Sequence, residues 1–157
     1  MKKKSGFTLL EMIIVLSMTI LILGMVTSVF MTGNKVFADS DVKTTLQMEA
    51  KGIQEKLSDI CMEASKEPTI NGDEIVFEDE KRQKTIINKN SNSLSILIND
   101  KDGNEVSKKI LSENIKSFEF EYSDNLFEIF LELQKDKGFS KNNSYKIQFT
   151  ITPRNIK

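Results

Sequence analysis

Histidine is absent from this chain of 157 residues, and cysteine occurs once, at Cys61. Without histidine, the zinc sites that include this residue cannot form, and neither can nucleophilic centres of the Ser-His-Asp or Cys-His kind. A single cysteine excludes a disulfide within the chain and leaves an intermolecular bridge or a free thiol. Catalysis would depend on carboxylates, lysines or hydroxyls alone, and no spacing indicates such a site. The sequence therefore predicts a protein with no catalytic residues, no metal and no cofactor.

A large excess of charge of one sign is also missing. Lysines and arginines number 22 and acidic residues 23, which gives a formal net charge of -1. The sequence contains no basic patch of the kind that would indicate nucleic acid as a direct partner. Hydrophobic residues make up 39% of the chain and charged residues 29%, a composition typical of a folded protein. At this length, the chain has room for one domain plus an appendage.

A stretch of nineteen residues, from Met12 to Phe30, contains no charge. It is rich in Ile, Leu, Met and Val, and its length is about that needed to span a bilayer as a helix. Three lysines, Lys2, Lys3 and Lys4, precede it. By the positive-inside rule they remain cytoplasmic, so the residues after Phe30 face the outside. We therefore expect a single-pass precursor in the cytoplasmic membrane with its C-terminal head outside.

A cleavable signal peptide is the alternative interpretation of this segment. Val36-Phe37-Ala38 would be its cleavage site, because small residues stand at the two positions that the signal peptidase reads. However, such signals have an apolar core of about 7 to 15 residues, shorter than the run seen here. The acidic Glu11 at the start of the run is also unusual for a signal peptide.

The first eleven residues, MKKKSGFTLLE, resemble the start of type IV prepilins and the related pseudopilins. The shared features are a short basic leader ending in glycine, then phenylalanine, then a glutamate at the fifth mature position. The resemblance implies cleavage by prepilin peptidase between Gly6 and Phe7, N-methylation of Phe7, and Glu11 as the fifth mature residue. It also implies a mature chain that is a filament subunit.

Glu11 has a physical reason to contribute to assembly. A helix that starts at the new N-terminus places Glu11 one turn from the α-amino group of Phe7, near the positive end of the helix dipole. An unpaired carboxylate in lipid costs about 2.5 kcal/mol or more, so pairing with the Phe7 amine of a neighbouring subunit favours association in a fixed register. The alternative is that Glu11 only caps its own helix in the headgroup region.

The helix is expected to continue beyond the apolar run, from Phe7 to about Ser65, until Pro68 stops it. Apolar residues recur at spacings of three and four, as in an amphipathic helix that covers a core. The stripe comprises Leu46, Ala50, Ile53, Leu57, Ile60 and Ala64. We therefore divide the chain into a leader (1–6), a transmembrane or filament-core helix (7–34), an amphipathic helix (35–67) and a head (68–157).

After Pro68 the apolar period changes from that of a helix to that of strands, which indicates an antiparallel sheet with one wet face. Alternation is clearest at Phe118, Phe120 and Tyr122, and from Phe127 to Leu133 around Glu128 and Glu132. The strands are expected at residues 74–77, 84–87, 93–99, 105–111, 115–122, 126–134 and 144–152. The fold class is thus α+β, with a long N-terminal helix packed on a small pilin-like head of antiparallel β-sheet.

Two polar segments of the head have a structural and a functional interpretation. Asp100, Asp102 and Asn104 alternate as in a calcium loop, but glycine is not at the sixth position and Leu111 replaces the glutamate at the twelfth. We therefore favour a turn between two strands. Lys135 to Asn143 is interpreted as a mobile polar loop between the last two strands, either solvated or in contact with a partner.

The C-terminal half resembles W-type minor pilins and J-type minor pseudopilins, through Leu111 to Phe120 and the final Thr152-Pro153-Arg154-Asn155. Ser28 stands where many major pilins have proline, and the single cysteine excludes the family's frequent disulfide loop. The resemblance implies a minor pilin that initiates or caps assembly. Its expected partners are other major and minor pilins, prepilin peptidase, the inner-membrane assembly platform and, before assembly, membrane lipid. The alternatives are a pseudopilin of a type II secretion or DNA-uptake machine, and a membrane-anchored extracellular binding domain.

Overall fold

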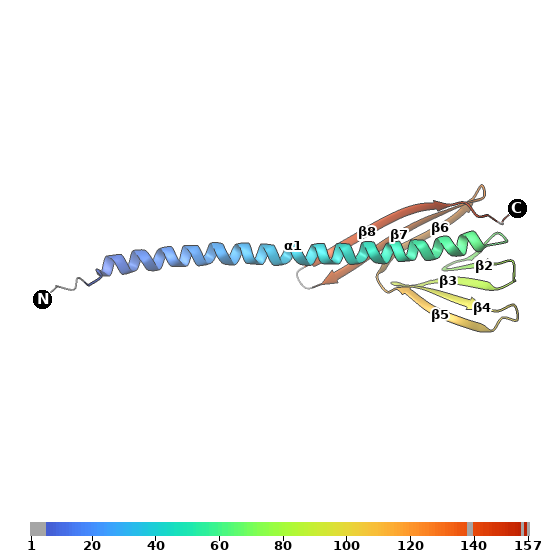
Figure 1. Ribbon diagram of the computed structural model, residues 1–157, viewed down its shortest axis with the longest axis horizontal. Coiled ribbons are helices and arrows are strands. Elements are labelled where there is room, and N and C mark those ends of the chain that lie inside the picture. Colours follow the sequence, from blue (N-terminus) through green and yellow to red (C-terminus); the bar gives the residue numbers. More distant parts are fainter. Residues whose placement is uncertain (1–5, 138–139, 155, 157) are drawn as a thin grey trace.

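The structure, a computed structural model, describes residues 6–137, 140–154 and 156. One helix, α1 (Leu9–Glu63), comes first and strands follow it. The N-terminal half of α1 projects alone, and the strands gather along its C-terminal half (Figure 1). This arrangement confirms the predicted α+β, pilin-like architecture. The strands are β1 (Thr69–Asn71), β2 (Glu74–Glu78), β3 (Lys84–Asn90), β4 (Ser93–Asn99), β5 (Glu105–Ser112), β6 (Ile115–Ser123), β7 (Leu126–Lys137) and β8 (Ser140–Ile151).

Helix α1 ends earlier than the sequence predicts. It stops at Glu63 because Ala64 takes an extended conformation (φ −60°, ψ 130°) and forms an isolated bridge with Asp79. The backbone N–H of Ser65 then donates to the carbonyl of Glu78 at 2.8 Å. The chain therefore leaves the helix to pair with the end of β2 before it reaches Pro68.

The predicted apolar stripe of α1 is confirmed. All six of its residues are buried, and Val42 and Cys61 are buried beside them. The helix thus packs one face against the head from Val42 onward, whereas its residues before Gly33 are exposed. Because isolated helices gain little stability from propensity alone, this packing stabilises the second half of α1.

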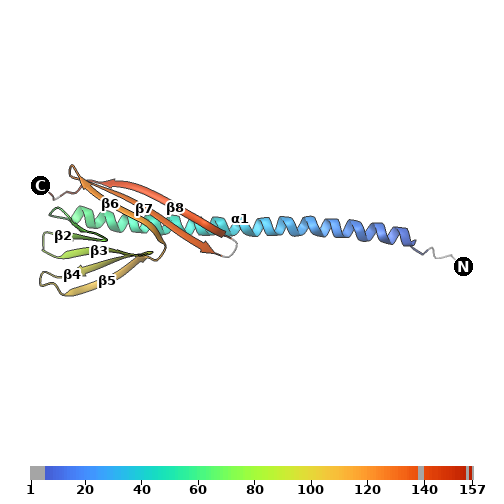
Figure 2. The ribbon, with the colours of Figure 1, turned by 180° about the vertical axis from the view of Figure 1, so that it is seen from behind.

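The strands divide between two antiparallel sheets. One has the order β1-β2-β3-β4-β5, and the other has the order β6-β7-β8. The three-stranded sheet crosses α1 and the other sheet lies beside it (Figures 1 and 2). Phe77 of β2 contacts Phe120 and Phe127 of the other sheet edge-on, with ring centroids 5.7 and 5.9 Å apart. The helix and both sheets therefore share one core.

Tight turns connect neighbouring strands of each sheet. Asp124 and Asn125 join β6 to β7, and both have positive φ (51° and 60°), as a type I′ hairpin turn requires. Between β4 and β5, Gly103 has φ 87°, and Asp100 Oδ1 accepts the N–H groups of Asp102 and Asn104 at 2.9 Å each. The hydrogen bonds, chiefly that from the backbone of Asn104, hold the pKa of Asp100 below its ordinary value of 3.8. The preferred interpretation of this segment as a turn is confirmed.

Three features of the head differ from the sequence predictions. The segment Lys135 to Asn143 is not a loop, because β7 continues to Lys137 and β8 begins at Ser140; Gly138 lies outside the described residues. Strand β1 is short and each of its three residues is exposed, so it shows no alternation from which it could be predicted. Glu132, expected on a wet face, is buried between Lys116 and Lys146, whose Nζ atoms lie 2.8 and 3.5 Å from its carboxylate oxygens.

Phe127→Ala is expected to destabilise the head by about 3 to 5 kcal/mol, the usual cost of removing a buried aromatic side chain. Phe127 is fully buried, and the centroid of its ring lies 4.8 Å from the ring centroid of Tyr122 and 5.6 Å from that of Phe120. The matched control is Phe130→Ala, in the same strand but half-buried on the opposite face, where less than half of that loss is expected. Urea unfolding of both variants measures the difference. Equal losses would show that the core does not lie on the Phe127 face.

Candidate functional site

The residues that the sequence singles out lie at the free end of α1. Gly6 and Phe7 precede the helix, and the Phe7 side chain is 78% exposed. Apart from Gly6 itself and its two chain neighbours, no residue has an atom within 4 Å of the position that a Cβ would take on Gly6. The Gly6–Phe7 peptide bond therefore lies in exposed chain, open to a processing enzyme. The rest of the predicted leader, including Lys2, Lys3 and Lys4, lies outside the described residues.

Glu11 closes a capping box with Thr8 at the start of α1. The N–H of Glu11 donates to Thr8 Oγ1 at 3.2 Å, and the N–H of Thr8 donates to Glu11 Oε2 at 3.4 Å. Thr8 takes an extended conformation (φ −76°, ψ 152°), as a residue that caps a helix does. Two backbone donors at the helix start are thereby satisfied. In the uncleaved chain, Glu11 thus caps its own helix, which is the alternative to pairing with the amine of a neighbouring subunit.

Thr8 is a residue of this site that the analysis of the sequence missed. The signal was present, because Thr8-Leu9-Leu10-Glu11 has the T-x-x-E spacing of a capping box. The carboxylate of Glu11 has capacity for more hydrogen bonds than the one it accepts from Thr8. Capping by Thr8 and pairing with an amine are therefore compatible roles for the same carboxylate.

The residues from Met12 to Phe30 form a helical surface that no other part of the described chain covers. Every one of them is exposed, although most are apolar. The hydroxyls of Ser17, Thr19 and Thr27 donate to the carbonyls four residues earlier, each at 2.8 Å. Polar groups inside a bilayer must find partners within the protein, and these hydroxyls do so. By length and composition, α1 is able to cross a membrane, and its first half is where it would do so.

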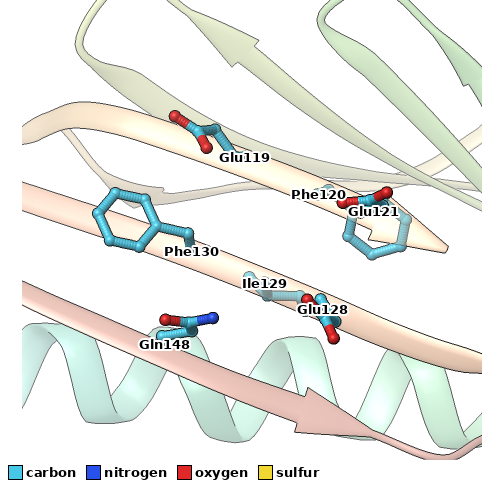
Figure 3. Close-up of a pocket in the computed structure, with 7 residues that line it drawn as sticks. All are labelled: Glu119, Phe120, Glu121, Glu128, Ile129, Phe130 and Gln148. Carbon is cyan, nitrogen blue, oxygen red and sulfur yellow. The ribbon is translucent and has the colours of Figure 1, made fainter. Parts of the chain in front are cut away.

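The outer face of the three-stranded sheet carries an acidic hollow (Figure 3). Glu121 of β6 and Glu128 of β7 are directly paired across the two strands, a placement of like charges that weakens a sheet. Its polar lining residues are three glutamates and one glutamine. Among the described residues, no three His, Cys, Asp or Glu side chains converge on a metal position. The lining residues are Glu119, Phe120, Glu121, Glu128, Ile129, Phe130 and Gln148.

Cys61 is a free thiol in the core, on the face of α1 that packs against the head. Burial raises the pKa of this thiol to about 12. A neutral, buried thiol is a poor nucleophile and cannot reach another chain without unfolding. Of the two possibilities that the sequence leaves open, the structure therefore favours the free thiol over an intermolecular bridge.

Comparison with known proteins identifies the N-terminal segment. Residues 1–30 match the family model of the prokaryotic N-terminal methylation motif. Searches of the curated proteins and of the solved structures returned no match. The matched segment contains Gly6, Phe7, Thr8 and Glu11, together with the exposed apolar residues from Met12 to Phe30.

Proposed function

We propose that this chain, which its methylation motif and its long apolar helix identify as a type IV prepilin- or pseudopilin-like protein, is a minor type IV pilin. Proteins of this type are structural subunits and not enzymes. The observation that carries the proposal is the match over residues 1–30, joined to a helix of 55 residues whose apolar half is exposed. That half can anchor a precursor in a membrane and later pack among other helices.

Processing is the first step of the proposed pathway. Prepilin peptidase cuts between Gly6 and Phe7 and methylates the new amine of Phe7. The exposure of both residues and the open space around Gly6 support this site. The head remains outside the cytoplasmic membrane, and the cleaved leader carries away Lys2, Lys3 and Lys4.

Assembly then depends on Glu11 and the amine of Phe7. Because an unpaired carboxylate in lipid costs about 2.5 to 3.5 kcal/mol, a cationic amine on a neighbouring pilin lowers the free energy of a subunit that docks in register. The exposed apolar face supplies the remaining contact area. The partners are other major and minor pilins, prepilin peptidase and the inner-membrane assembly platform, with membrane lipid around the helix before assembly.

Glu11→Leu is expected to be inserted and cleaved but to enter filaments poorly, because it removes the charge without weakening the membrane helix. Glu11→Gln keeps the size and some hydrogen bonding of the side chain, and the same defect is expected. Met12→Leu, an apolar change in the same turn, is the control and should assemble normally. Immunoblots of sheared filaments and of membranes measure incorporation. Normal incorporation of Glu11→Leu would exclude charge pairing as the source of register.

The minor role is supported by the C-terminal end of the head and by one position in the apolar helix. The strand that ends at Ile151, followed by Thr152-Pro153-Arg154, and the serine at position 28 support an initiating or capping subunit. A pseudopilin of a type II secretion or DNA-uptake machine would carry the same N-terminal segment. Neighbouring genes, and the loss of pili, secretion or DNA uptake in a deletion strain, distinguish these machines.

A minor subunit is expected to be scarce, and yet its deletion should strongly reduce filament number. An initiator is needed only once or a few times per filament, whereas each later subunit docks on the growing end. Quantitative mass spectrometry of sheared filaments measures how scarce the subunit is. Filament counts in the deletion strain measure how strongly its loss reduces filament number. If this chain were the dominant filament protein, the minor assignment would be wrong and the pilin-type assignment would stand.

A further inference from the structure

The β7–β8 hairpin extends farther toward the apolar half of α1 than the rest of the head does (Figures 1 and 2). We refer to residues 135–137 and 140–143 as the hairpin end. Lys137 Nζ donates to Asp41 Oδ2 of α1 at 2.8 Å. Ala38 and Asp39 of α1 are half-buried, unlike the exposed residues before Gly33. The hairpin end is therefore held beside α1 at the base of the head, next to the segment that spans the membrane.

Lysines gather at this base. Lys35 and Lys43 of α1 and Lys135, Lys137 and Lys141 of the hairpin end are termed here the membrane-side lysines. The ion pair with Lys137 is the main cause that holds the pKa of Asp41 below its ordinary value of 3.8, and the nearby charge of Lys135 contributes. Asp136 Oδ1 accepts the N–H of Asn142 at 2.7 Å. Two of the local carboxylates are thus already engaged.

The charge at the base has the opposite sign to that of the rest of the head. From residue 35 to the C-terminus the chain has 19 Lys and Arg residues and 22 Asp and Glu residues. The base holds five of these cations, against the three carboxylates of Asp39, Asp41 and Asp136. The base is therefore net positive, while the remainder of the head is net negative. A surface of this kind favours an anionic partner below the head.

Distances along α1 place the base close to the lipid headgroups. A hydrocarbon core of about 30 Å takes about 20 helical residues, so a helix that enters near Glu11 leaves the core near Phe30. At about 1.5 Å per residue, Asp41 lies roughly 16 Å beyond Phe30. The headgroup layer covers roughly the first 5 to 8 Å of that distance. The remainder is about one Debye length at physiological ionic strength, so negative charge on the headgroups still attracts the lysines.

We propose that the membrane-side lysines dock the head on anionic phospholipid headgroups while the chain is still in the bilayer. The lysine ammonium groups are attracted to the lipid phosphates across this short distance, and the Lys137–Asp41 pair keeps the hairpin end oriented toward them. Entry into a filament removes this attraction, so the anionic lipid opposes extraction of the subunit. This inference rests on the proposed function, because it requires that the apolar half of α1 span a membrane.

The test uses the full chain in lipid nanodiscs, one chain per disc, with discs of phosphatidylcholine alone or with phosphatidylglycerol added. A brief pulse of an amine-reactive reagent, followed by mass spectrometry, reports how fast each lysine is modified. Lys135 and Lys141 are expected to react about fivefold more slowly in the anionic discs, and high salt should remove the difference. Lys108 and Lys109 of β5 are exposed internal controls and should react equally in both discs.

Charge reversal supplies the matched variants. Detergent should extract the unaltered chain more slowly from anionic discs than from neutral discs. Lys135→Glu with Lys141→Glu should abolish this difference, and Lys108→Glu with Lys109→Glu, the same charge change on β5, should retain it. Loss of the difference in both double variants would overturn the assignment of the contact to the base of the head.

The remaining outcomes separate this inference from the proposed function. Equal lysine reactivity in the two discs, with the apolar segment protected from protease in both, would overturn the docking and leave the membrane anchor intact. A chain that does not stay with either disc would contradict the anchor itself. Protection by inorganic phosphate in neutral discs, or protection only in discs with two chains, would overturn the lipid surface as the partner.

Discussion

A fragment that begins at Pro68 is expected not to fold, whereas a fragment that begins at Lys35 is expected to be soluble, monomeric and folded. Of the 20 buried hydrophobic residues in the described core, eight lie from Val42 to Ala64 and are absent from the shorter fragment. Without them, β7 and β8 lose the surface on which they pack, and apolar side chains such as Leu131 and Leu133 become exposed to water.

Circular dichroism, thermal unfolding and the binding of an apolar dye measure the difference between the two fragments. The longer fragment should show mixed helix and strand and one cooperative transition. The shorter fragment should bind the dye and lack that transition, and a peptide of residues 35–67 added in trans should restore part of it. Equal thermal stability of the two fragments would show that the helix is not part of the core.

Gly6→Leu is expected to leave a full-length precursor in the membrane, with no shortened product. The peptidase of this family cuts after glycine, and a bulky side chain beside the cleaved bond hinders its approach. Because a Cβ on Gly6 meets no atom within 4 Å beyond those of its two chain neighbours, the change should not disturb the fold itself. The expected loss of processing is therefore nearly complete.

Gly24→Leu is the matched control for this experiment. Gly24 also has open space around it, and it lies in the apolar helix that follows Gly6. Insertion of this variant should be unimpaired and its cleavage normal. Immunoblots of whole cells distinguish the long and short forms. A shortened, methylated product from Gly6→Leu would contradict the assigned cleavage site.

Much of the fold follows from periodicity in the sequence. The spacing of Leu46, Ala50 and Ile53 predicts the buried face of α1, and the alternation from Phe127 to Leu133 predicts the buried face of β7. These predictions succeed because residues three or four apart on a helix share one face, as do alternate residues on a strand. The turn at Asp100 was predictable for a related reason, since its carboxylate makes hydrogen bonds within the turn.

Features that depend on distant contacts were not predictable. The end of α1 depends on pairing with β2, and the burial of Glu132 depends on lysines from β6 and β8. The hairpin end is polar, so its strands lack alternation and are held by the backbone ladder and by Asp41. At the N-terminal site, Gly6, Phe7 and Glu11 were found from one motif. Thr8 was missed, although its spacing from Glu11 is that of a capping box.

The proposed function requires that this chain be a prepilin that matures at Phe7. The most direct measurement is mass spectrometry of the N-terminus of the protein purified from its native membrane or filament. We expect a chain that begins at Phe7 and carries a methyl group on its α-amine. A chain that begins at Met1, or one cut after Ala38 as by signal peptidase, would contradict it.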